Sequence, residues 1–195
     1  MRTLALVVAR VIAGVLLVLP VAHAETVSLP YDLMIDLPEG WRVDGPEQGK
    51  LGTDGLRRVQ LICDTEACEK TQETCTVLMR RKPIEGDDDA AKVRALYESP
   101  FQRYLRLRAV LRNTSRDAEI LKPLELVKIG ERDWYRVETD ARHNYKSGFF
   151  AETVVNGLYV GTICKSCETG AVRHQDGLRI LTSLKLRALK AAGAH

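Results

Sequence analysis

Five cysteines offer the richest chemistry in this sequence, and they fall into two groups. The first group is Cys63, Cys68 and Cys75, and the second is Cys164 and Cys167. Cysteines form disulfides, exchange disulfides as catalysts, or bind zinc as thiolates. Because the number is odd, two bridges would leave one cysteine outside them. Each of the five can be the one left out, and the other four pair in three ways, so the sequence alone does not give the connectivity.

The second group forms the motif Cys164-Lys165-Ser166-Cys167. Two thiols at this spacing suit redox exchange, and a neighbouring lysine favours the reactive thiolate. A thioredoxin-type enzyme also needs further strands, a helix and a proline after the motif. Only 28 residues follow Cys167, and the last proline is Pro123. The motif therefore favours a structural disulfide, and a thiol-disulfide oxidoreductase is the alternative.

A thiolate zinc site is the second alternative. Cys63, Cys68, Cys164 and Cys167 could together supply the four sulfur ligands of a tetrahedral zinc ion. However, 95 residues separate the two pairs, far more than in a zinc ribbon or finger. An oxidising compartment also converts accessible thiols to disulfides. Disulfides are therefore preferred, and we expect no metal and no cofactor.

The N-terminus has the pattern of a cleavable signal peptide over residues 1–24. Arg2 precedes an apolar core at 11–21, and Ala22-His23-Ala24 places small residues at the two positions that signal peptidase reads. The core is too short to span a bilayer. We expect cleavage after Ala24, a periplasmic or secreted protein, and no membrane span after cleavage. Such a compartment oxidises thiols, which is why the cysteines favour disulfides.

The sequence shows no catalytic constellation. The histidines beyond the signal segment are His143, His174 and His195, and no nucleophile elbow, phosphate-binding glycine loop or zinc-protease helix accompanies them. Two of the 29 basic residues and none of the 26 acidic ones lie in the signal segment, so the mature net charge would be +1. That balance gives no case for nucleic acid or an anionic membrane as the partner.

The apolar pattern predicts both strands and helices. Alternation predicts a strand at 31–37, and residues 58–63 and 74–80 predict a hairpin that carries three cysteines. Residues 90–112 are helical in character, with a break near Pro100. An antiparallel meander and a closing element follow: strands at 124–129, 134–138, 149–155 and 158–164, a helix at 175–184, and alternatively a short strand at 184–186.

In the second half of the helical region, Phe101, Tyr104, Leu107 and Leu111 recur at helical spacing. Such a stripe is typical of a helix face packed on a core. Arginines surround it, and we interpret them as a solvated face whose stems flank the core rather than as a site for acidic partners. They are Arg103, Arg106, Arg108, Arg112 and Arg116.

Short motifs along the chain also allow comparison with known families. They are Leu37-Pro38-Glu39-Gly40-Trp41 after an alternating strand, the helical middle, turns at Gly130 and Asn156-Gly157, and the closing Ile180-Leu181-Thr182-Ser183-Leu184. In this order they resemble the PsbP-like family over most of the mature chain. The resemblance implies an antiparallel sheet of about six or seven strands covered by helices on both faces. It also implies an accessory or binding protein without catalytic residues. The five cysteines are not part of the family's pattern.

These observations predict an α+β protein with one domain over residues 25–187 and a frayed tail over 188–195. The expected function is non-catalytic binding to another protein of the cell envelope. Two duties would fit: an accessory subunit of an envelope complex, or a neutraliser of an exported toxin.

Overall fold

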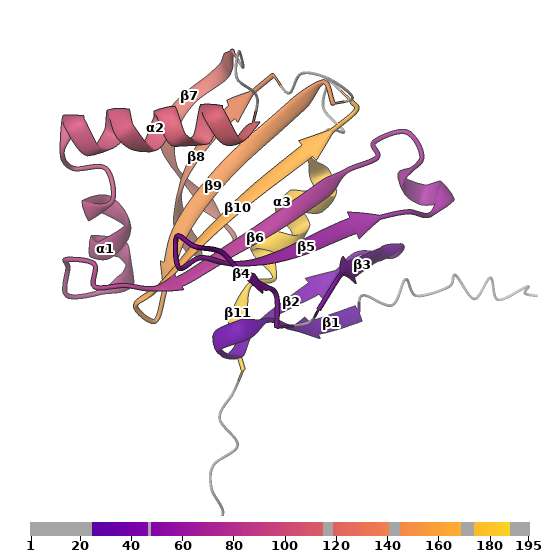
Figure 1. The fold of residues 1–195 in the computed structure, drawn as a ribbon, viewed down its shortest axis with the longest axis horizontal. Helices are drawn as coiled ribbons and strands as arrows, with labels where there is room; N and C mark the ends of the chain where they lie inside the picture. The colour runs from indigo at the N-terminus through magenta and orange to yellow at the C-terminus, as the bar shows by residue number, and fades with distance from the viewer. Residues whose placement is uncertain (1–24, 47, 115–118, 141–144, 169–173, 188–195) are drawn as a thin grey trace, which may run out of the picture.

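An eight-stranded antiparallel sheet forms the centre of the protein in the computed structural model of the chain (Figure 1). The structure describes residues 25–46, 48–114, 119–140, 145–168 and 174–187. The predicted signal peptide, the predicted tail, His143 and His195 lie outside these residues. The α+β fold class and the antiparallel sheet of the sequence prediction are confirmed.

The sheet runs in the order β3-β5-β6-β10-β9-β8-β7, and β4 pairs with β5 at one side. Its strands are β3 (Trp41–Asp44), β4 (Lys50–Leu51), β5 (Arg57–Cys63), β6 (Thr74–Arg81), β7 (Ile120–Ile129), β8 (Arg132–Thr139), β9 (Ser147–Val155) and β10 (Leu158–Ser166). A second, three-stranded sheet consists of β1 (Glu25–Ser28), β2 (Leu33–Leu37) and β11 (Lys185–Leu186). The helices are α1 (Asp89–Ala95), α2 (Pro100–Thr114) and α3 (Gln175–Thr182), with short 3-10 turns η1 (Pro30–Asp32) and η2 (Glu66–Cys68).

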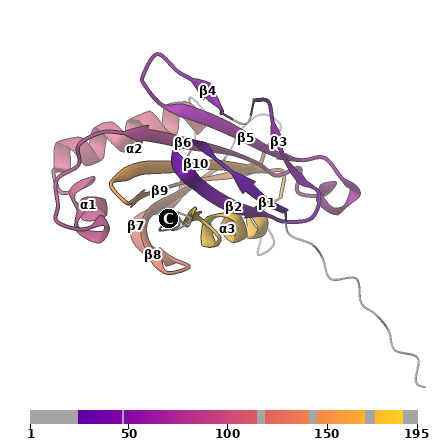
Figure 2. The same cartoon turned by 90° about the horizontal axis from the view of Figure 1, so that it is seen from below.

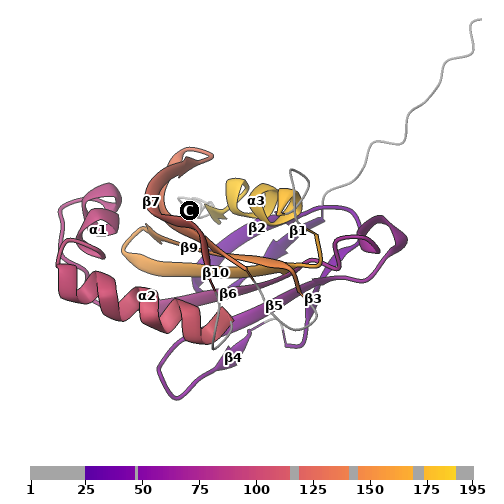
Figure 3. The ribbon, with the colours of Figure 1, turned by 90° about the horizontal axis from the view of Figure 1, so that it is seen from above.

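Both faces of the large sheet are covered. Helix α3 and the small sheet lie on one face, and α1 and α2 lie on the other (Figures 2 and 3). Each face has its own apolar core, one around Trp41, Leu61 and Ile180 and the other around Tyr97 and Val154. All nine residues of β9 are buried, because alternate side chains meet the two cores. Any polar side chain on this strand must therefore find its partner inside the protein.

The helical middle is divided at the predicted break. Helix α1 ends before Pro100, which begins α2. Asp88 caps α1 by accepting a hydrogen bond from the backbone N of Ala91 at 2.7 Å. Asp89 accepts hydrogen bonds from the backbone N–H groups of Asn156 and Gly157, which turn from β9 to β10 with φ of 49° and 73°. The predicted Asn-Gly hairpin is thus present and is held by the helix start.

Two boundaries differ from the sequence prediction. The strand expected at 31–37 begins at Leu33, because Tyr31 and Asp32 form a turn with φ of 65° and 61° after Pro30. The closing helix ends at Thr182, and the short strand considered as its alternative follows as β11. No helix of the described residues is long and apolar enough to cross a membrane.

Candidate functional site

Helix α2 turns aromatic and apolar side chains toward solvent. Phe101 is 68% exposed, Tyr104 57% and Leu105 46%. Arg108 is also exposed, and it lies on the same side of the helix by its spacing. We call these four residues the outer face of α2. Helix α2 lies across the sheet on the side opposite α3, so this face points away from the body of the protein (Figures 1 and 3).

The predicted apolar stripe of α2 is therefore wrong in its first half. The helix packs against the core with Leu107 and Val110, whereas Phe101 and Tyr104 point outward. The physical reason is an ion pair, because the side chain of Arg106 reaches the sheet and fixes the rotation of the helix. The spacing of apolar residues alone could not predict that a charged residue, Arg106, would lie on the side of α2 that faces the sheet.

The arginines around this stripe are not simply a solvated face. Arg103 donates from Nη2 to the backbone carbonyl of Leu124 at 3.2 Å, and Arg106 donates from Nη1 to Glu152 Oε2 at 2.8 Å. Arg108 is exposed, as expected. The Arg112 side chain and Arg116 lie outside the described part of the chain.

Glu152 is the centre of a buried polar cluster beneath α2. Its side chain is fully buried, and the Arg106 guanidinium lies 5.5 Å from the ring centre of Tyr97 and 5.9 Å from that of Tyr159. Burial is the largest single influence on the pKa of Arg106 and lowers it, but the Glu152 charge, the two tyrosines and the hydrogen bond to Glu152 together raise this pKa above its ordinary value. Burial, and next the Glu152 charge, raise the pKa of both tyrosines. The cluster holds one ion pair, which anchors α2 to the sheet, and two protonated tyrosines beside it.

Gly161 makes room for this cluster. It pairs with Glu152 across β9 and β10, so a side chain at either position would lie on the same face of the sheet. A Cβ atom at Gly161 would lie 2.9 Å from the Tyr159 hydroxyl. The absence of a side chain at this position lets Tyr159 fold back over its own strand toward Glu152.

Four of the five cysteines form two disulfides. Cys75 and Cys164 pair directly across β6 and β10 and are bridged, with their Cα atoms 4.1 Å apart. Cys63 and Cys68 close the start of the loop that joins β5 to β6. Cys167 belongs to neither bridge, and its thiol donates to Gln72 Oε1 at 3.5 Å. The chain therefore has disulfide bonds, as the sequence predicted, but Cys164 is bonded to Cys75 and not to Cys167, the neighbour that the motif favoured.

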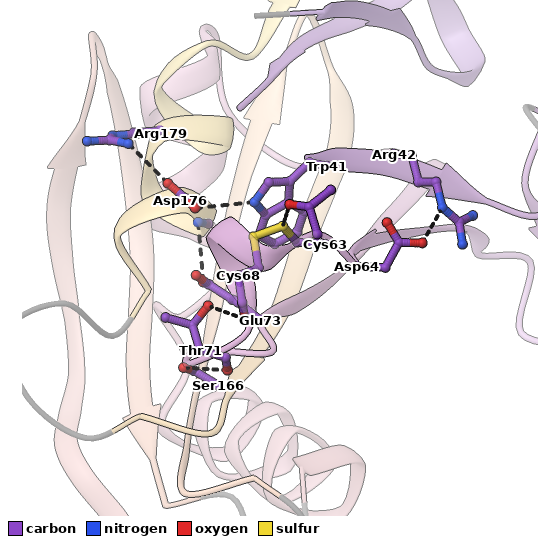
Figure 4. Close-up of a disulfide and its surroundings, with 12 residues drawn as sticks. Trp41, Arg42, Cys63, Asp64, Cys68, Thr71, Glu73, Ser166, Asp176 and Arg179 are labelled. Atoms are coloured by element: carbon purple, nitrogen blue, oxygen red, sulfur yellow. Dashed lines mark hydrogen bonds and ion pairs between the residues drawn. A yellow bond between two sulfur atoms is a disulfide. The ribbon is translucent and has the colours of Figure 1, made fainter. Parts of the chain in front are cut away.

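Beside the Cys63–Cys68 disulfide, hydrogen bonds fasten the loop between β5 and β6 to the end of β10 and the start of α3 (Figure 4). The Thr71 carbonyl accepts hydrogen bonds from Ser166 Oγ at 3.2 Å and from the backbone N of Cys167 at 2.7 Å. Trp41 donates from its ring nitrogen to Asp176 at 3.3 Å. We call this region the cysteine end. Its contacts join four segments that are distant in sequence, so its evident role is structural.

His174 and Glu73 are buried together at the cysteine end. His174 Nδ1 lies 3.5 Å from Glu73 Oε1, and both side chains are almost fully buried. Glu73 Oε1 also accepts from the backbone N of Gly177 at 3.2 Å, and the His174 ring packs edge-on against Phe149. In this arrangement a substrate cannot reach the imidazole, so His174 is part of the core rather than an accessible general base.

The connectivity bears on both alternatives for the cysteine motif. Cys164 is bonded to Cys75, so it does not form a redox pair with Cys167. Of the four thiols considered for zinc, Cys63, Cys68 and Cys164 are consumed in disulfides. Glu73 does lie with Cys75 and Cys164 in a group of metal-ligand spacing, but the two sulfurs are joined and offer no thiolate. Neither alternative is favoured by this arrangement.

Sequence reasoning missed Glu73 and Glu152. The role of Glu152 could have been found from the sequence, because this residue interrupts the apolar run of residues 149–155. An acidic side chain in a strand that is covered on both faces requires a partner inside the protein. Glu73 stands two residues before Cys75 without a comparable pattern. Its burial depends on the docking of α3, which no local pattern reveals.

Comparison with known proteins gives a fold. No family model matches the chain, and no curated protein matches it. Among solved structures, cyanobacterial PsbP from Synechocystis sp. PCC 6803 is similar, with a TM-score of 0.53 and 16% identity over 86% of this chain and 94% of that chain. A protein from Bacteroides thetaiotaomicron has a TM-score of 0.45 and 10% identity, over 85% of this chain and 49% of that chain. The chain thus has a PsbP-like fold.

Proposed function

We propose that this chain is an exported accessory protein that binds another protein of the cell envelope through the outer face of α2. It works after removal of residues 1–24, in the periplasm if the source is a Gram-negative bacterium. Its contribution to the complex is binding rather than catalysis. The disulfides suit this location, because they keep the loops of a small domain in place outside the reducing cytoplasm.

The observation that carries the proposal is the exposure of Phe101, Tyr104 and Leu105 on one helix face. Burying an aromatic or leucine side chain stabilises a protein by about 1.5–3 kcal/mol. The side chains of this face are exposed in the free chain and do not contribute this free energy to its stability. Single exposed apolar residues are ordinary, but neighbouring ones form a patch typical of binding surfaces. Tyrosine and arginine beside each other are also frequent energetic centres of interfaces.

The nearby sheet edge is less suited to binding. Strand β7 ends the large sheet and has exposed Ile120 and Leu121. However, its pairing with β8 shifts register twice between Ile120 and Glu125, and Pro123 within it lacks an N–H donor. Irregular edges with proline resist the addition of a further strand. A partner is therefore expected to dock on the helix face rather than to extend the sheet.

The test compares three forms of the full chain, all produced in the organism from which the protein comes. Native gel electrophoresis and mass spectrometry of the envelope fraction would show the partner of the wild type. The variant Phe101→Ser/Tyr104→Ser should run without this partner. Leu186→Ser is the matched control, because Leu186 is 38% exposed on β11, which pairs with β2, and β2 lies on the face of the large sheet opposite α2 (Figure 3). It should keep the complex.

Two results would contradict the proposal. One is a wild-type chain that runs as a monomer or as a complex of its own copies only. The other is a partner that is kept equally by all three forms. Circular dichroism of each purified variant shows whether the fold is retained, which separates lost binding from lost structure.

A further inference from the structure

We infer that a basic pocket beside the outer face of α2 accepts a carboxylate side chain of the partner protein. The pocket lies between α2 and the strands beneath it, has a volume of about 350 Å³, and is lined by Arg80, Lys82 and Arg106 among other residues. The inference rests on the proposed function and deepens it. It assigns the partner a segment in which an acidic residue is flanked by apolar ones.

The three cations are close enough to affect one another. Burial lowers the pKa of Lys82, and the charges of Arg106 and Arg80 lower it further. Glu152 neutralises Arg106, but within the described chain no carboxylate forms an ion pair with Arg80 or Lys82. Arg80 donates from Nη1 to the backbone carbonyl of Asp54 at 3.1 Å, and its buried Nε has no hydrogen-bond partner. An anion in the pocket would relieve the repulsion among the three cations.

The walls of the pocket favour a protein side chain over a free inorganic anion. Leu105 and Tyr159 line it, so the cations are reached across apolar surface. Leu105 also belongs to the outer face of α2, which makes the pocket and the aromatic face one continuous surface. A nucleic acid would need a longer basic stripe. An acidic residue between apolar neighbours matches both the cations of the pocket and the apolar side chains of the outer face of α2.

Two synthetic peptides test the inference on the full chain: acetyl-Phe-Glu-Leu-amide, and acetyl-Phe-Gln-Leu-amide as its uncharged match. Their affinities are measured by NMR titration of the ¹⁵N-labelled protein. The glutamate peptide should bind about tenfold more tightly, the effect of one charge-assisted hydrogen bond. Its largest shifts should fall on the amides of Arg80, Lys82 and Arg106.

Variants of Lys82, the half-buried lysine of the pocket, sharpen the test. Lys82→Gln should reduce the preference for glutamate severalfold, and Lys82→Glu should reverse it in favour of acetyl-Phe-Lys-Leu-amide. Lys70→Gln is the matched control, because Lys70 is an exposed lysine of the cysteine end. It should leave both affinities unchanged.

Equal binding of the glutamate and glutamine peptides would overturn the inference. So would inorganic phosphate or anionic vesicles that bind the pocket more tightly than the glutamate peptide does. These results do not depend on finding the partner. If an envelope complex forms but Lys82→Gln leaves it intact, the inference fails while the proposed function stands, and if no complex forms, the proposed function fails by itself.

Discussion

Removing each disulfide separately should show that the two bridges stabilise the fold unequally. Cys75 and Cys164 are 89 positions apart in sequence, and Cys63 and Cys68 are 5 apart. On the chain-entropy account, each bridge stabilises the fold by lowering the conformational entropy of the unfolded chain. The stabilisation at 25 °C is about 4–5 kcal/mol for the Cys75–Cys164 bridge and about 2 kcal/mol for the Cys63–Cys68 bridge. The two loops do not overlap, so their effects are independent. We therefore expect the loss of the long-range bridge to cost about 2–3 kcal/mol more than the loss of the short one.

The assay is urea unfolding of Cys75→Ala/Cys164→Ala and Cys63→Ala/Cys68→Ala, followed by tryptophan fluorescence. Both pairs carry Cys167→Ala in addition, which prevents thiol exchange. All four bridged cysteines are at most 9% exposed, so the packing lost on substitution by alanine is similar in the two pairs. Equal losses, or a larger loss for the short bridge, would refute the reasoning from loop length.

Three further predictions concern single side chains. Glu152→Gln leaves Arg106 without its counter-ion under α2, so urea unfolding should show a loss of about 3–5 kcal/mol, whereas the exposed control Glu125→Gln should change little. Gly161→Ala places a methyl group against the Tyr159 hydroxyl and should cost about 1–3 kcal/mol in the same assay, so a neutral result would show that Tyr159 is free to move. Arg58 and the backbone N of Leu56 hold the pKa of Asp54 at about 2, below its ordinary 3.8. The stability that the ionised Asp54 contributes is therefore present above pH 3.8 and is lost as the pH falls toward 2. The urea midpoint of Asp54→Asn should fall less over that pH range than the midpoint of the wild type.

Local patterns predicted the elements whose causes are local. Pro100 divides the helical middle, Asn156-Gly157 turns the central hairpin, and alternation buries Leu33 and Ile35. In each case the deciding chemistry lies within a few residues of the element. The α+β fold and the resemblance to PsbP proteins followed from the order of these elements.

The site depends on contacts between distant segments, which local patterns do not contain. The outward position of Phe101 follows from the pairing of Arg106 with Glu152, 46 residues further along the chain. The pairing of Cys75 with Cys164 follows from the register of β6 against β10. Spacing within the motif suggested Cys167 as the neighbour of Cys164, but tertiary structure placed another cysteine directly opposite.

The proposed docking on α2 can be tested most directly by site-specific photo-crosslinking in the living host. The photoreactive residue p-benzoylphenylalanine replaces Tyr104 in one strain and Leu186 in another, and crosslinked products are identified by mass spectrometry. The account predicts that position 104 captures one envelope protein and position 186 does not. Equal capture from both positions, or no capture from position 104, would contradict it.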